Sequence, residues 1–167
     1  CRGTGTVQAT KTLEVSIPAG IDNGQRISLR GQGSDGLRGG SAGDLLISVA
    51  VKAHPVFERD GYDIYCEVPI TFTEATLGAE IDIPTLEGKE KFTVSEGTQT
   101  GTSFTLKQKG VPYVNNSSRR GDLIITVVIE VPKNLSSAQK EKLREFAELS
   151  GETNYTKKTK FFKKFFK

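Results

Sequence analysis

The stretch GDLLISVAV, at residues 43–51, recurs as GDLIITVVI at residues 121–129, 78 positions later. Each copy opens on Gly-Asp and continues as a nearly uninterrupted apolar run rich in β-branched residues. Such a run predicts a strand that is covered on both faces, as in a β-sandwich. The recurrence decides the fold, because it indicates that one β-rich unit occurs twice.

The repeat extends upstream of these strands. Residues 15–33 align with residues 92–110 at an offset of 77. Identical aligned residues are Gly20, Gly24, Leu29 and Gly33, which fall on Gly97, Gly101, Leu106 and Gly110. This period exceeds the roughly 20–50 residues of solenoids and propellers. The alignment therefore predicts two copies of a small domain.

Short alternating segments fill both copies. Strands are expected over residues 11–17, 26–30, 45–51, 63–72, 80–83, 91–94, 103–106 and 123–131. Short strands separated by Gly- and Pro-rich turns are typical of sandwiches or small barrels. We therefore predict an all-β fold of two tandem small β-sandwich domains followed by a short C-terminal helix, with a domain boundary at His54-Pro55.

The helix is expected after Asn134. Ser136 and Gln139 have the spacing of a capping box, and Leu143, Phe146 and Ala147 form one apolar stripe. A lone helix of about 15 residues is marginal in water, so this one must dock on its own chain or on a partner. Gly151 is a natural C-terminal stop.

Charge is unevenly distributed. The formal net charge is +3, but residues 152–167 hold six Lys and one Glu, which leaves the remainder slightly acidic. A second stripe of Phe161, Phe162, Phe165 and Phe166 lies among these lysines. We expect this Lys/Phe tail to fold back on the body.

Composition indicates a soluble protein in a reducing compartment, and we expect it in the cytoplasm. No apolar run approaches the ~20 residues of a membrane span, and no signal peptide is visible. Two distant cysteines do not form a disulfide framework. Because the chain lacks an initiator Met, we interpret it as a fragment of a longer protein.

Signals for catalysis are weak. Residues 31–36 match G-x-G-x-x-G, but the Gly-rich segment that follows cannot open the helix that a dinucleotide site requires. His54, the only histidine, is expected to be structural, and Cys66 is expected to be a buried small hydrophobe. No pair of carboxylates can be placed together, so we do not expect an enzyme.

One motif points to a family. Cys1-Arg2-Gly3-Thr4-Gly5 resembles the end of a C-x-x-C-x-G-x-G zinc module. Residues 12–24, 43–45 and 54–64 resemble, in order, the C-terminal half of DnaJ-type J-domain co-chaperones, and residues 85–88, 99–101 and 109–112 continue the match. The resemblance covers about residues 1–151. The His-Pro here precedes Val, so it is not the His-Pro-Asp of a J-domain.

The resemblance implies a domain plan. Residues 1–5 would end the zinc-binding Cys-rich domain and residues 6–53 would form the C-terminal part of the first sandwich. Residues 54–133 would form the second sandwich, residues 134–151 a dimerisation helix, and residues 152–167 the basic tail. Cys1 would be a zinc ligand only in the complete protein, because one thiolate cannot make a four-coordinate site. No cofactor is expected in this fragment.

The resemblance also implies a function. Family members hold unfolded polypeptides in an apolar groove and deliver them to an ATP-driven DnaK-type chaperone. The substrate-binding positions carried over to this chain are Leu13 and Ile47, and strand alternation adds Val15 and Leu45 to the predicted site. The homodimer contact would use Leu143, Phe146, Ala147 and Leu149.

Other interpretations remain open at this stage. The groove residues could all be core, although Leu13 aligns with Glu90, a residue that a pure core position would not readily accept. A tandem β-sandwich module that binds glycans or another ligand is the alternative function. The Lys/Phe tail could bind nucleic acid or a membrane, but we expect neither partner.

Overall fold

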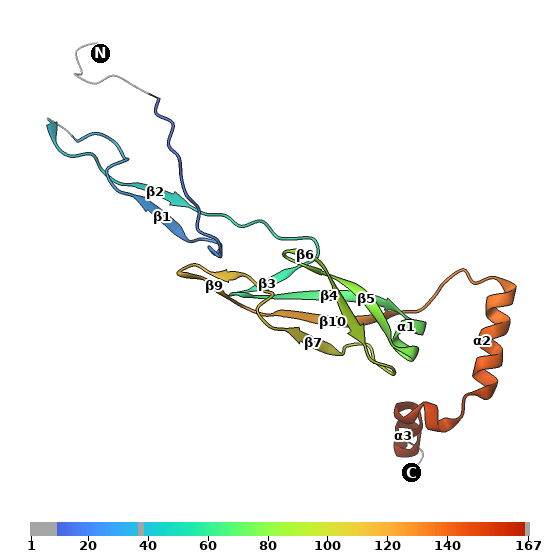
Figure 1. Cartoon of the computed structure of the whole chain (residues 1–167). Coiled ribbons are helices and arrows are strands. Elements are labelled where there is room, and N and C mark those ends of the chain that lie inside the picture. Colours follow the sequence, from blue (N-terminus) through green and yellow to red (C-terminus); the bar gives the residue numbers. More distant parts are fainter. Residues whose placement is uncertain (1–9, 37–38, 166–167) are drawn as a thin grey trace. The chain divides into compact units, whose positions relative to one another are not determined.

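The computed structural model describes residues 10–36 and 39–165 and confirms the all-β fold with helices at the C-terminus (Figure 1). The chain divides into two compact units, one up to Ile129 and the other from Glu130 onward. The first unit contains the strands. The second contains the last two α-helices.

Within the described residues the strands form four sheets. Their order is β1-β2, β3-β4-β10-β7, β5-β6 and β8-β9. The bounds are β1 Arg26–Leu29, β2 Leu45–Ser48, β3 Glu58–Asp60, β4 Asp63–Thr71, β5 Ala79–Thr85, β6 Gly88–Val94, β7 Ser103–Leu106, β8 Pro112–Tyr113, β9 Asn116–Arg120 and β10 Leu123–Glu130. The sequence did not indicate β3 or the β8-β9 hairpin, because these strands are short and their side chains are largely exposed.

The core of the first unit lies between the four-stranded sheet and the β5-β6 hairpin. Side chains of β4 alternate strictly between buried and exposed, so one face of this strand supplies Ile64, Cys66, Val68 and Ile70 to the core. The other buried core residues are Leu123, Ile125 and Val127 of β10, Ile83 of β5, Val94 of β6, and Ala75. Burial, with a smaller contribution from Glu67, raises the pKa of the Cys66 thiol. The expectation that Cys66 is a small buried residue is confirmed.

Strands β4 and β10 begin side by side although they are distant in sequence. The Ile64 amide donates to the Asp122 carbonyl at 3.0 Å. The Asp122 amide donates to a carboxylate oxygen of Asp63 at 2.7 Å. These bonds fix the central strand pair of the larger sheet.

A short helix, α1 (Phe72–Leu77), follows β4. Its start is fixed by a capping box: the Thr71 side chain accepts from the Glu74 amide, and the Glu74 side chain accepts from the Thr71 amide. The Glu74 carboxylate accepts from the Thr71 amide and also from the Thr71 hydroxyl, and these two bonds lower the pKa of Glu74.

Hydrogen bonds show the sequence repeat directly. The Gly24 amide donates to the Val49 carbonyl at 2.9 Å, and the aligned Gly101 amide donates to the Val127 carbonyl at 2.8 Å. The β1-β2 register pairs Ile27 with Ile47, just as the β7-β10 register pairs the aligned residues of the second copy. Both copies therefore build the same antiparallel pair.

Two strand predictions were wrong in the first copy. Residues 11–17 are extended but pair with no strand in the described part of the chain. The strand expected over residues 45–51 ends at Ser48, and it is not covered on both faces, because Leu46 is 60% exposed. In the second copy the aligned strand lies between β4 and β7, whereas β2 has only β1 beside it among the described residues.

Arg59 joins the turn before β1 to the second copy. Its guanidinium donates to the carbonyls of Gly20 and Ile21 at 3.0 and 2.9 Å, and to that of Gly61 at 2.7 Å. An ion pair with Asp22, at 3.7 Å, adds to these bonds. Gly20 has φ +87°, and a Cβ there would overlap the Pro112 carbonyl, so the close approach requires glycine.

The His54-Pro55 segment precedes this contact. The His54 Nδ1 accepts from the amides of Val56 and Phe57 at 3.1 and 3.2 Å. Its ring stacks on that of Phe57, with centroids 5.0 Å apart. The structure thus gives His54 the structural role expected from the sequence.

We expect Arg59→Lys to loosen the turn at residues 18–22 without unfolding the core. A single ammonium cannot reproduce the forked contacts of the guanidinium to three carbonyls. Hydrogen exchange should therefore rise at Ile21 and Gln25, whose amides bond within this turn. Amides of β4 and β10 should keep their protection. Unchanged exchange at the turn would contradict the role assigned to Arg59.

The second unit is helical. It contains α2 (Ser137–Leu149), a 3₁₀ turn η2 (Glu152–Asn154) and α3 (Thr156–Phe165). The capping box of Ser136 and Gln139 is present as expected, and the Ser150 amide donates to the Phe146 carbonyl at the end of α2. The Lys/Phe tail thus contains a helix of its own, which the sequence indicated only as an apolar stripe. None of the helices in the described ranges is long and apolar enough to cross a membrane.

Candidate functional site

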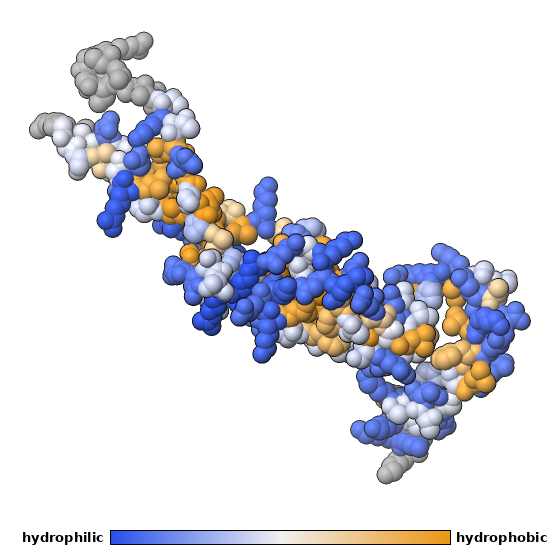
Figure 2. All heavy atoms as spheres, viewed as in Figure 1, coloured by the Kyte–Doolittle hydropathy of each residue, from blue (hydrophilic) through white to orange (hydrophobic). Residues whose placement is uncertain are grey.

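The β1-β2 hairpin carries an apolar surface on one face. Ile27 lies opposite Ile47 and Leu29 lies opposite Leu45 in the antiparallel register. All four side chains are half-buried, and the residues between them are exposed. We call these four residues the hairpin face; orange residues gather over this hairpin in Figure 2.

The aligned surface of the second copy is covered. Leu123 and Ile125, which align with Leu45 and Ile47, are 0% and 1% exposed. They pack in the core beneath the β5-β6 hairpin, with Phe104 and Leu106 against it. The same strand pair therefore presents a closed core in one copy and a partly open apolar face in the other.

Leu13 and Val15 lie in the extended segment before β1. Both are half-buried, and the residues between and around them are exposed. The side-chain alternation predicted for residues 11–17 is therefore present at Leu13 and Val15 but not at Ile17, which is 62% exposed. The structure brings Leu45 and Ile47 together on one strand face; the roles of all four residues stay predictions.

Sequence reasoning omitted Ile27 and Leu29 from the site. The hairpin register shows that they share a face with Ile47 and Leu45. The signal was present in the alternation of residues 26–30 and in the turn that precedes them. If the segments at residues 26–30 and 45–51 had been treated as an antiparallel pair, Ile27 and Leu29 would have been placed opposite Ile47 and Leu45.

Glu90 shows how the second copy accepts a charge at the position aligned with Leu13. Its carboxylate forms an ion pair with Lys109 Nζ at 2.7 Å. This bond raises the pKa of Lys109. The first copy has Gln32 where the second has Lys109, and Gln32 accepts instead from Lys11 at 2.7 Å. The two copies therefore differ in polarity along this edge.

Groups that could support catalysis are used structurally. Cys66 is buried in the core and His54 accepts two backbone hydrogen bonds. No three residues among His, Cys, Asp and Glu come together as a metal site within residues 10–36 and 39–165. Cys1 and the predicted zinc-domain end at residues 1–5 lie outside the described residues.

We expect the purified chain to carry no equimolar zinc. Zinc in a protein takes four ligands, and the chain contains two Cys and one His. With Cys66 buried and His54 engaged, Cys1 has no thiolate or imidazole partner of its own chain. Elemental analysis after dialysis measures this directly. Tight binding of one zinc per chain would contradict the prediction.

The aromatic surface near β8 is also occupied. The rings of Tyr62 and Tyr113 stack with centroids 3.9 Å apart. The Arg119 guanidinium lies 4.7 Å from the centroid of the Tyr113 ring. Because these rings cover one another, they do not offer the open platform on which a sugar could stack.

The second unit has an apolar stripe and a cavity. Leu143 and Phe146 are 38% and 44% exposed, and Leu149 is 87% exposed. Ala147, the fourth predicted dimer residue, lines a cavity of about 530 Å³ with Ser150 and residues of α3. Leu143, Phe146 and Leu149 are not among the residues that line this cavity; the dimer role of all four residues stays a prediction.

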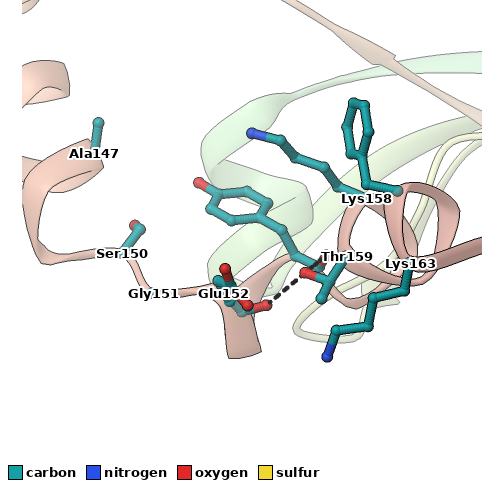
Figure 3. Close-up of a pocket in the computed structure, with 9 residues that line it drawn as sticks. Ala147, Ser150, Gly151, Glu152, Lys158, Thr159 and Lys163 are labelled. Carbon is teal, nitrogen blue, oxygen red and sulfur yellow. Dashed lines mark hydrogen bonds between the residues drawn. The ribbon is translucent and has the colours of Figure 1, made fainter. Parts of the chain in front are cut away.

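Figure 3 shows how the cavity is built. Ala147 and Ser150 come from the end of α2, and Lys158, Thr159 and Lys163 from α3. Thr159 donates to the Glu152 carbonyl at 3.3 Å, which ties α3 to the turn η2. The cavity thus defines the side of α3 that faces α2.

These features define a class: an all-β chain of two related units, with a partly open apolar face and a helical C-terminal unit. A family model described as "DnaJ C terminal domain" matches residues 3–132. A second, described as "Chaperone protein DnaJ C-terminal region", matches residues 138–167. The chain belongs to the DnaJ C-terminal domain family.

Similar proteins agree with this assignment. The chain is 56% identical over 164 residues to "Chaperone protein DnaJ" of Acetivibrio thermocellus, which covers 98% of this chain and 42% of that protein. The protein of the same name from Clostridioides difficile is 58% identical, over 90% of this chain and 39% of that protein. The one from Neisseria meningitidis is 51% identical, over 97% of this chain and 43% of that protein. The chain spans about two fifths of the length of these relatives.

Proposed function

We propose that this chain is the part of a DnaJ-type co-chaperone that binds unfolded or misfolded polypeptide and holds two copies together. The observation that carries the proposal is the half-buried hairpin face, whose aligned residues are fully buried in the second copy. Membership of the DnaJ family supports a chaperone role for such a face.

The hairpin face suits a ligand of varied sequence. Apolar contact is non-directional and depends on the area removed from water, so Ile27, Ile47 and their neighbours can accept different large side chains. An extended client can also add as a strand to a hairpin edge, where main-chain hydrogen bonds do not depend on side-chain identity. We include Leu13 and Val15 in this site.

Such a site needs no catalytic group. Binding by partial burial gives modest affinity and rapid release, which a protein that passes clients onward requires. We propose an ATP-driven DnaK-type chaperone as the recipient, by analogy with the family. The direct test is fluorescence polarisation of a labelled apolar peptide. Binding should saturate and persist at moderate salt, whereas salt-sensitive binding would indicate an electrostatic partner and oppose the proposal.

We further propose that α2 forms the homodimer contact. The helix has no buried residue in the described structure, and its stripe exposes Leu143 and Phe146. A dimer would present two hairpin faces to one client, which raises avidity for long chains without any new contact.

A further inference from the structure

The helix α3 separates its side chains into two surfaces. Tyr155, Lys158, Thr159, Phe162 and Lys163 line the cavity against α2. At 3.6 residues per turn, two ridges of side chains point away from that cavity. One contains Lys157, Phe161 and Phe165, and the other contains Lys160 and Lys164. We call these five residues the outer face of α3.

The outer face is both apolar and cationic. Phe161 is 64% exposed and Phe165 is 73% exposed. Lys157, Lys160 and Lys164 lie beside them, and none of the three forms an ion pair with a carboxylate in the part of the chain that the structure describes. From Thr156 to Phe165 the helix carries five lysines and no acidic residue.

We propose that the outer face of α3 docks on an anionic lipid surface. A short helix with Phe on one ridge and Lys on the neighbouring one has the composition of helices that lie in the plane of the membrane interface. The phenyl rings would enter the boundary between headgroups and acyl chains. The lysines would reach the headgroup phosphates while their methylene stems stay on the apolar side.

Two other partners fit the outer face less well. Nucleic acid would use the lysines, but α3 lacks Arg, Asn and Gln in its sequence TKKTKFFKKF, and two exposed phenyl rings gain nothing from a phosphate backbone. A second copy of α3 would cover the rings but would oppose five positive charges with five more. Only an anionic apolar boundary complements both kinds of side chain.

This proposal departs from the expectation that the chain has no membrane partner. That expectation rested on the absence of a spanning segment and on a tail that folds back on the body. A helix that lies on a surface needs no spanning segment. It goes beyond the proposed client binding and does not depend on it, because the hairpin face lies in the other compact unit.

The test uses the full chain with vesicles of equimolar phosphatidylglycerol and phosphatidylcholine, and with vesicles of phosphatidylcholine alone. We expect co-sedimentation with the anionic vesicles only. Lys157→Gln with Lys160→Gln and Lys164→Gln should weaken binding about a hundredfold. The matched control, Lys89→Gln with Lys107→Gln and Lys133→Gln, removes the same charge from exposed positions outside α3 and should change binding little.

A second measurement separates insertion from simple charge attraction. The chain contains no Trp, so Phe161→Trp supplies a single reporter, whose emission should shift to the blue on anionic vesicles. Phe161→Ser with Phe165→Ser should abolish binding while α2 remains helical.

Four outcomes would overturn the proposal: no binding to anionic vesicles, equal loss in the control, no emission shift, or full binding by the double Ser variant. Tighter binding to duplex DNA that survives the double Ser change would assign the outer face to nucleic acid. Conversion of a dimer to a monomer by that change would assign it to a second copy. Either result would also reject the lipid proposal.

Discussion

Replacing Leu13 and Ile47 by Ser is expected to weaken binding of an unfolded client by roughly thirtyfold. Each change removes a half-buried aliphatic side chain from the proposed site. Partial burial of two such side chains is worth about 2 kcal/mol, which corresponds to roughly thirtyfold in Kd. Fluorescence polarisation with a labelled apolar peptide measures the change.

The first copy offers a matched control for this experiment. Ile17 and Leu46 lie on the same two segments as Leu13 and Ile47, but they are 62% and 60% exposed. Changing both to Ser deletes the same kinds of side chain from outside the proposed site, so binding should be retained. If the Leu13/Ile47 variant binds the peptide as tightly as the parent chain, with an unchanged circular dichroism spectrum, the site assignment is wrong.

Leu143→Asp with Phe146→Asp is expected to convert a homodimer into monomers. Both side chains belong to the exposed stripe of α2. Truncation of a buried Phe alone typically costs about 3–5 kcal/mol, and a buried unpaired carboxylate costs more. A contact through one helix of 13 residues cannot absorb such a loss. Sedimentation velocity at tens of micromolar shows the change directly.

Two controls accompany the dimer experiment. Lys160→Ala with Lys163→Ala should leave the dimer intact, because these residues belong to α3 rather than to the stripe. Cys66 should stay unreactive toward thiol reagents in every variant, since it is 4% exposed in the core of the other unit. A monomeric parent chain, or a dimeric double Asp variant, would mean that the stripe packs within its own chain.

The second copy was predicted well because its sequence pattern and its packing agree. Alternation in β4 and the apolar run in β10 both reflect a core that closes around them. The β7 bounds match the expectation of residues 103–106, and the capping box at Ser136 was visible as spacing alone. The residues of these strands and of this helix start carry the signal themselves, so a single sequence is enough to predict them.

The first copy was predicted less well for a physical reason. Its sequence is that of a strand pair in a closed sandwich, but Leu46 is exposed and residues 11–17 have no strand partner among those described. An apolar sequence pattern indicates that a side chain is suited to a buried environment. It does not show which other residues cover that side chain. For the same reason the register pairs Ile27↔Ile47 and Leu29↔Leu45, which complete the hairpin face, emerged only from the three-dimensional structure.

Adjacent positions of β4 and β10 impose an order on folding during synthesis. Asp63 and the Asp122 amide that it accepts from are 59 residues apart, so loop closure must precede the central strand pair. The β1-β2 hairpin can form as soon as Ser48 has left the ribosome, whereas the edge of β4 that pairs with β10 must wait until β10 has emerged. At about 5–20 residues per second, that edge stays unpaired for several seconds. A nascent chain arrested before Leu123 therefore exposes an unpaired strand edge, which is a template for aggregation.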